Sequence, residues 1–400
     1  MWENAKEFGA MMVFAEHRYF GKSVPYGKDA RNHLKHLSSE QALADYAVLI
    51  TFIKEKFKAQ YSAVIGFGGS YGGMLGSWFR IKYPHIIDGV IAGSAPVLSF
   101  LGENPPMDPG SFSKIVTYDA SPAAGSAKNC VSNVKKTWDI IFNSGKTDDG
   151  LKMLSSAFGL CEPLNSESDA HALADWVKGA YDYLAMGNYP YPSSYIMNGE
   201  SVLPAYPVRV ACSYLQDEYP TDTKEAKQSL MRAVRSSVGV YYNSTGNVKC
   251  HSFLQPSNES QNDADFWDYL FCSELYQPTD QGVGDMYWTV LHNQTADAER
   301  CMSNWGVKLR PNWATIVYGG RKALKASSNI VFSNGNYDPW SGTGVTESLS
   351  NTVVAVHVNG GAHHLDLMFS NPLDSDDIKN ARLQEKAHMW KWINEVNARS

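Results

Sequence analysis

The sequence has no long run of one charge and no extended apolar segment. Its 35 Lys and Arg residues and 41 Asp and Glu residues leave a net charge of −6, and the two signs are well mixed along the chain. Because no basic stripe is present, nucleic acid is not an expected partner. The longest apolar run, about residues 47–53, is far too short for a membrane span. We therefore expect neither nucleic-acid binding nor a membrane-spanning helix.

Metal-binding patterns and a leader peptide are also missing. None of the six cysteines belongs to a C-x-x-C pair, and the histidines form no HExxH helix. A metal site at His363, His364 and Asp366 is a weak alternative, so we expect no metal and no other cofactor. The N-terminus shows no basic region followed by an apolar stretch, so no signal peptide is visible.

The composition is that of a large folded protein from an oxidising compartment. The 400 residues fit one large domain or two, and 44% hydrophobic residues suffice for a sizeable core. The dispersed cysteines suit three disulfides, whose pairing the sequence alone leaves open. Three N-glycosylation sequons lie in the same segment as the cysteines, at Asn243, Asn258 and Asn293. Together these features favour a secretory route.

Strand and helix patterns alternate at the two ends of the chain. Apolar runs predict strands at residues 10–15, 62–67, 89–95, 329–333 and 352–358. Helical patterns separate them: a capping box at Ser38 and Gln41 begins one helix, Pro84 ends another, and a third covers about 375–396. This alternation predicts an α/β protein with a parallel sheet.

One glycine-rich stretch, GFGGSYGGML at residues 66–75, contains Gly-x-Ser-x-Gly centred on Ser70. A predicted strand precedes it and a predicted helix follows, which is the context of a nucleophile elbow. The glycines let neighbouring chain pass without Cβ clashes. The N–H of Tyr71 then points into an anion site at the helix N-terminus, where it can serve as an oxyanion donor. The alternative interpretation is an ordinary glycine-rich turn.

A serine nucleophile needs a base and an orienting acid, and the late strands end in suitable residues. Asp338 follows the strand predicted at 329–333, and His363 follows the strand predicted at 352–358. The order serine, acid, histidine is that of α/β-hydrolases. His364 is a rival to His363 as the base. We predict a triad of Ser70, Asp338 and His363.

The middle of the chain differs from both ends. It holds all six cysteines and all three sequons, and helical patterns cover residues 129–143, 167–186 and 222–241. We therefore predict an α/β-hydrolase domain made of residues 1–105 and 315–400, N-terminally truncated. Residues 106–314 are predicted to form a mostly helical, disulfide-stapled cap insertion.

Six motifs along the chain resemble the prolylcarboxypeptidase and dipeptidyl peptidase II family of serine exopeptidases. They are EHRYFGKS (16–23), SSEQALADYA (38–47), GGSYGGML (68–75), KYPHIIDGVIAGSAPV (82–97), SNGNYDPWSG (333–342) and GGAHHLDL (360–367). These enzymes act at proline and are usually lysosomal. The resemblance implies the same triad, peptide substrates with proline near a terminus, and a lysosomal or secreted protein. It also implies the disulfides Cys130–Cys212, Cys161–Cys250 and Cys272–Cys301.

The resemblance favours a Pro-Xaa carboxypeptidase acting through an acyl-enzyme. Release of N-terminal Xaa-Pro dipeptides, as by dipeptidyl peptidase II, is one alternative, and a non-catalytic truncated glycoprotein of the same fold is another. A proline ring needs a compact apolar slot, and Met74 and Trp340 are candidate walls because each lies beside a predicted catalytic residue. Plain core packing is the other role open to both side chains. A homodimer is the candidate assembly.

Three departures from the family pattern matter. The chain begins after the segment that supplies a further strand and a second oxyanion donor in the family, so we expect a truncated sequence that is inactive if it is complete as printed. Met368 stands where arginine is usual after HHLDL, which puts support of the histidine loop in doubt. Leu270 stands where glutamine is usual.

Overall fold

A four-stranded parallel sheet forms the centre of the computed structural model, which describes residues 1–253 and 261–399. The strands are β1 (Ile65–Gly69), β2 (Gly89–Gly93), β3 (Ile330–Gly335) and β4 (Val353–Val358). They pair in the order β1-β2-β3-β4, and every pair is parallel. The predicted parallel sheet is confirmed, and four of the five predicted strands are present with bounds shifted by at most three residues.

The fifth predicted strand, at residues 10–15, is wrong. The run AMMVFA has no secondary structure and pairs with none of the four strands. Met11, Val13 and Phe14 are exposed. An apolar run becomes a strand only where a neighbouring strand takes up its backbone N–H and C=O groups, and no such partner lies beside this run in the described residues.

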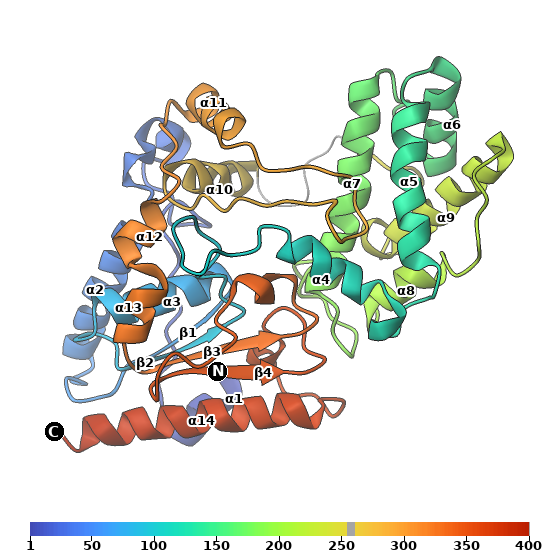
Figure 1. Ribbon diagram of the computed structural model, residues 1–400. Helices are drawn as coiled ribbons and strands as arrows, with labels where there is room; N and C mark the ends of the chain where they lie inside the picture. Colours follow the sequence, from blue (N-terminus) through green and yellow to red (C-terminus); the bar gives the residue numbers. More distant parts are fainter. Residues whose placement is uncertain (254–260, 400) are drawn as a thin grey trace.

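Helices cover both faces of the sheet (Figure 1). The long α14 (Asp376–Asn397) lies on one face, where Trp392 packs so closely on Gly89 that a Cβ there would lie 2.0 Å from the indole ring. The opposite face carries α2 (Ser39–Lys56) and α3 (Tyr71–Lys82), with α12 (Trp313–Tyr318) and α13 (Gly320–Ala326) nearby. Ser38 caps α2 by accepting the Gln41 N–H at 3.2 Å, as the capping box predicts.

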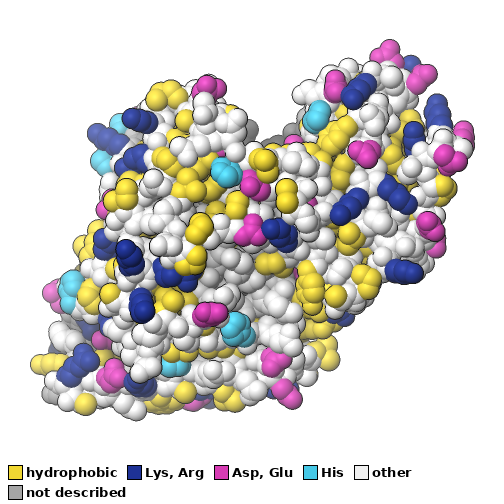
Figure 2. All heavy atoms as spheres, in the orientation of Figure 1, with side chains coloured by type: hydrophobic (Ala, Val, Ile, Leu, Met, Phe, Trp, Pro, Cys, Tyr) yellow, Lys and Arg dark blue, Asp and Glu magenta, His cyan; other side chains and the backbone are white. Residues whose placement is uncertain are grey.

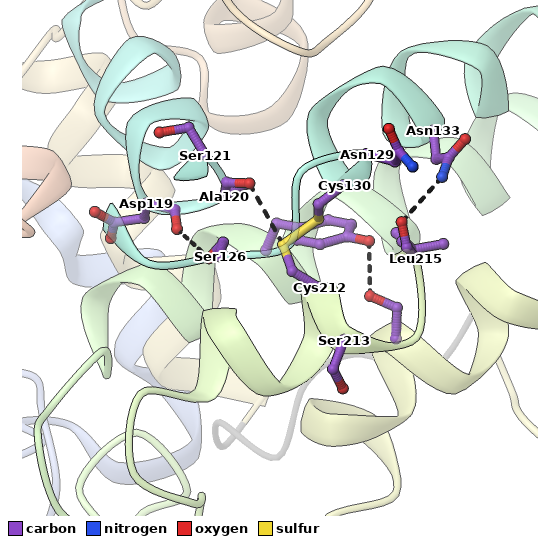
Figure 3. The surroundings of a disulfide bond; sticks show 12 residues. Asp119, Ala120, Ser121, Ser126, Asn129, Cys130, Asn133, Cys212, Ser213 and Leu215 are labelled. Atoms are coloured by element: carbon purple, nitrogen blue, oxygen red, sulfur yellow. Dashed lines mark hydrogen bonds between the residues drawn. A yellow bond between two sulfur atoms is a disulfide. The ribbon is translucent and has the colours of Figure 1, made fainter. Parts of the chain in front are cut away.

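Six helices between β2 and β3 share one hydrophobic core and form a helical lobe (Figure 1). They are α4 (Ser111–Asp119), α5 (Cys130–Ser144), α6 (Asp148–Phe158), α7 (Glu167–Met186), α8 (Pro207–Ser213) and α9 (Lys224–Tyr242). The disulfide Cys130–Cys212 joins α5 to α8 at the base of this lobe (Figure 3). The three predicted helices in this region are therefore confirmed.

Two later helices of the middle segment pack outside the lobe core. Helix α10 (Gln261–Ser273) places Leu270 in the hydrophobic core that also contains residues of α2 and α3. The disulfide Cys272–Cys301 joins α10 to α11 (Gln294–Trp305). Residues 106–314 thus fall into two groups, and the division into one domain and one cap stays a prediction. Figure 2 shows a notch on one face between the helical lobe and the part that carries α10 and α11.

The remaining elements are short. They are α1 (Trp2–Phe8) and the 3-10 turns Gly27–His36, Pro122–Ala124, Pro339–Thr343 and Leu365–Leu367. None of the helices in the described part of the chain is sufficiently long and apolar to cross a bilayer.

Candidate active site

The glycine-rich stretch is a sharp turn from β1 into α3, with Ser70 at its apex. Ser70 has φ 56° and ψ −126°, a region that L-residues rarely occupy, and its N–H donates to the Gly93 carbonyl at 2.9 Å. A Cβ on Gly68 would lie 2.1 Å from the carbonyl oxygen of Gly72. Glycine is therefore required at position 68, and the serine is held in a strained conformation of the kind found at functional sites.

The two late strands bring an acid and a histidine into direct contact. Asp338 follows β3 and His363 follows β4, and His363 Nδ1 lies 2.9 Å from Asp338 Oδ1. Both side chains are buried, with Asp338 0% and His363 3% exposed. The same Asp338 oxygen accepts the N–H of Trp340 at 3.1 Å, which fixes the carboxylate. This pair has the geometry by which an acid orients an imidazole and selects its tautomer.

The serine turn and the histidine loop are packed against each other. A Cβ on Gly69 would lie 2.7 Å from the His364 ring, and the His364 N–H donates to Ser94 Oγ at the end of β2 at 2.7 Å. The His363 and His364 rings lie 4.4 Å apart. Within the part of the chain that it describes, the structure records no hydrogen bond between the Ser70 hydroxyl and the His363 imidazole. Such contacts are often long until substrate binds.

His364 differs from His363 in its surroundings. Burial, followed by the neighbouring His363, lowers the pKa of His364 to about 3, so the ring is neutral across the physiological range. Its Nε2 lies 2.8 Å from the Tyr195 hydroxyl. Only the His363 ring contacts the Asp338 carboxylate. This geometry favours His363 over His364 as the base.

The residues predicted to line the site are placed as follows. Tyr71 is the first residue of α3, and its hydroxyl lies 3.2 Å from His17 Nε2. Trp340 is partly exposed and packs edge-on against Phe112, with ring centroids 4.9 Å apart. Met74 is only 2% exposed and lies in the core cluster of the sheet helices. The roles of Tyr71, Trp340 and Met74 stay predictions.

The three disulfides in the structure are the pairs that the resemblance implies: Cys130–Cys212, Cys161–Cys250 and Cys272–Cys301. Two sequons lie at helix ends. The side-chain oxygen of Asn293 caps α11, and that of Asn243 accepts the N–H of Val248 at 2.9 Å. Asn258 lies outside the described residues. Glycosylation at all three stays a prediction.

Support of the histidine loop comes from an arginine that the sequence analysis did not single out. Arg382 on α14 donates to the carbonyl oxygens of Asp366 at 2.8 Å and Leu365 at 3.3 Å. It also pairs with Asp374 at 2.6 Å. Although position 368 is a methionine, Arg382 therefore provides a guanidinium that supports this loop. The signal for Arg382 in the sequence was weak, because this residue lies 16 positions beyond Asp366 on a separate helix.

A second group of missed residues lies behind the acid. Asp119 at the end of α4 is fully buried, and its Oδ2 accepts the Asn188 amide at 3.2 Å. Burial raises the pKa of Asp119 well above its ordinary value, with a further contribution from the negative charge of Asp338. The sequence analysis assigned neither Asp119 nor Asn188 to the site. In the described part of the chain, no cluster of three or more His, Cys, Asp or Glu side chains is suited to hold a metal ion.

The chain matches the family model "Serine carboxypeptidase S28" over residues 1–385. It is 42% identical over 399 residues to lysosomal Pro-X carboxypeptidase of Homo sapiens, covering 98% of this chain and 77% of that protein. The Bos taurus protein of the same name is 40% identical over 404 residues, covering 100% and 78%. "Prolyl carboxy peptidase like protein 5" of Caenorhabditis elegans is 38% identical over 419 residues, covering 99% and 79%. The chain therefore belongs to the serine carboxypeptidase S28 family, and it is a serine-type peptidase with an α/β-hydrolase fold.

Proposed function

We propose that the protein is a carboxypeptidase that removes the residue after a penultimate proline, with Ser70, His363 and Asp338 as its catalytic triad. The observation that carries the triad is the buried His363–Asp338 pair at 2.9 Å, on a loop packed against the strained turn of Ser70. The substrate class is supported by similarity to relatives named lysosomal Pro-X carboxypeptidase.

In the proposed mechanism, His363 takes the proton of Ser70 as the hydroxyl oxygen attacks the carbonyl of the penultimate proline. The negative charge that develops on the carbonyl oxygen is stabilised by the N–H of Tyr71 at the start of α3. His363 then protonates the departing amine, which leaves an acyl-enzyme on Ser70. Water activated by the same imidazole releases the peptide and restores the serine.

Asp338 serves the histidine through its charge and its position. Its carboxylate accepts the Nδ1–H of His363, which leaves Nε2 free to face the serine. Because Asp338 is fully buried, its attraction to the imidazolium is screened much less than it would be in water. The Trp340 N–H bond to the same oxygen keeps the carboxylate from rotating away.

The proline slot is proposed to use Trp340, which follows Asp338 by two residues and is partly exposed. Its indole also contacts α7, since Nε1 donates to the Met186 sulfur at 3.3 Å. Met74 is proposed to contribute to the floor of this slot, because its side chain is buried. An indole face beside the triad suits a rigid, apolar proline ring.

The proposed location is the lysosome or the secretory route, and the proposed assembly is a homodimer. Three disulfides suit an oxidising compartment, and the relatives at 40–42% identity are named lysosomal. Sedimentation of the purified protein tests the dimer directly.

Two assays test the function. A fluorophosphonate probe should label the wild type and fail to label Ser70→Ala, whereas equal labelling of both would refute Ser70 as nucleophile. Two peptides then separate the substrate classes. We expect cleavage of an N-terminally blocked peptide ending in Pro-Xaa; release only from a free-amine Xaa-Pro amide would overturn the carboxypeptidase assignment in favour of a dipeptidyl peptidase.

A further inference from the structure

The segment that follows α7 lies against the histidine loop, although about 170 residues separate the two in sequence. The His363 N–H donates to the Met186 carbonyl oxygen at 3.2 Å. The Tyr189 hydroxyl donates to the His363 carbonyl oxygen at 2.7 Å. Both backbone polar groups of His363 are therefore bonded to residues at the end of α7 or just after it, and this segment contributes to the geometry of the site.

The same segment contacts the neighbouring parts of the site. Met186 accepts the Trp340 indole N–H through its sulfur at 3.3 Å, and the Tyr195 hydroxyl lies 2.8 Å from His364 Nε2. His364 has φ 41°, a left-handed conformation that is costly for a residue with a side chain. Such a conformation persists only where surrounding contacts fix it. The segment at 186–195 bonds to His364 through Tyr195 and to the adjacent His363 through Met186 and Tyr189.

Tyr189 is the residue of this segment whose side chain bonds to the backbone of the proposed base. Its side chain is fully buried, so its hydroxyl has no water to exchange for the His363 carbonyl oxygen. The rest of the residue is also fixed, because the Tyr189 carbonyl accepts the Tyr206 N–H at 2.7 Å. Removing the hydroxyl would leave a buried carbonyl oxygen without this donor, on the residue that must hold its imidazole between acid and serine.

Resting on the proposed function, we infer that Tyr189 is a positioning residue for the reaction: it fixes the backbone of His363 so that the imidazole stays aligned with Asp338. A purely structural role is the competing explanation, since any buried tyrosine hydroxyl in a hydrogen bond stabilises the fold. The structure offers a matched control within the helical lobe. Tyr181 on α7 is equally buried, and its hydroxyl is bonded to Ser237 at 2.8 Å, within the lobe.

The test compares Tyr189→Phe with Tyr181→Phe in the full chain. Each variant loses one buried hydroxyl, so we expect similar small decreases in Tm. For hydrolysis of the blocked Pro-Xaa peptide, Tyr189→Phe should lower kcat by about tenfold with KM within about twofold. Its acid limb in the pH dependence of kcat/KM should move down by about 0.5 pH unit, because the imidazolium is held less firmly by Asp338. Tyr181→Phe should leave both quantities unchanged.

A spectroscopic measurement separates failure of this inference from failure of the proposed function. The proton between His363 Nδ1 and Asp338 should give a far-downfield proton NMR signal that disappears in Asp338→Asn. We expect this signal to broaden or shift in Tyr189→Phe and not in Tyr181→Phe, even if no peptide is cleaved. The inference is overturned if both variants lower kcat equally, or if Tyr189→Phe leaves the kinetics and the signal as in the wild type.

Discussion

The conformation of Ser70 predicts an unusual effect of substitution on stability. Its backbone, at φ 56° and ψ −126°, lies in a region that glycine occupies freely and other residues do not. Holding a residue with a Cβ there costs about 1–3 kcal/mol. Ser70→Ala keeps this strain and Ser70→Gly releases it. Glycine also gains conformational freedom in the unfolded chain, which reduces the stability gained from releasing the strain by about 0.4–1 kcal/mol.

The net expectation is that Ser70→Gly is more stable than Ser70→Ala by roughly 1 kcal/mol. For a chain of 400 residues, each kcal/mol moves Tm by about 1 °C, so urea unfolding is the more sensitive measurement. Both variants lack the hydroxyl and should fail to bind the fluorophosphonate probe. Their difference in stability is therefore independent of catalysis.

Ser77 provides a control position at which the opposite preference between alanine and glycine is expected. Ser77 lies in the interior of α3 and is fully buried. In a helix interior glycine is less stable than alanine by about 1 kcal/mol. We therefore expect alanine to be preferred over glycine at position 77 and the reverse at position 70. If alanine is equal or better at both positions, the strained elbow is refuted.

Three further predictions concern the acid, a buried carboxyl and a disulfide. Asp338→Asn should lower kcat by about 10³–10⁴-fold, because the imidazolium loses its charged partner; steady-state kinetics with little change would contradict the triad. Burial raises the pKa of Glu274 to about 7 from 4.5, so the folded state keeps a proton that the unfolded state releases. Stability should therefore decline as pH rises from about 4.5 to about 7, and Glu274→Gln should remove roughly 3 kcal/mol of that decline in urea unfolding; an unchanged decline would argue against this site. Replacing Cys130 and Cys212 by alanine should cost about 2–5 kcal/mol, and an unchanged urea midpoint would contradict a structural role for this bridge.

Local patterns in the sequence were sufficient to predict the elements that place the candidate site. The glycine spacing around Ser70 predicts a turn, because a Cβ on Gly68 has no room beside Gly72. The apolar runs before Asp338 and His363 are short and bounded by polar residues, so β3 and β4 are found near the predicted positions. Helix α7 has the predicted bounds, 167–186, because its capping serine and apolar period are both local features.

What the sequence could not predict depends on partners that are remote along the chain. The run at residues 10–15 has the composition of a strand, but pairing is a property of a neighbour and not of the run itself. Likewise, nothing near Tyr189 indicates that its hydroxyl reaches the carbonyl of His363. Arg382 and Asp119 were missed for the same reason, since both reach the site only through the tertiary fold.

Three buried carboxyl groups change the stability of the fold in the same direction as pH rises. Burial raises the pKa of Asp119, Glu274 and Glu385, so each contributes stability in acid that is lost as pH rises through its folded-state pKa. Asp119 also feels the charge of Asp338. The raised pKa of Asp119 favours a neutral carboxyl beside the proposed acid, so the burial that contributes to stability in acid also limits the negative charge near the His363–Asp338 pair.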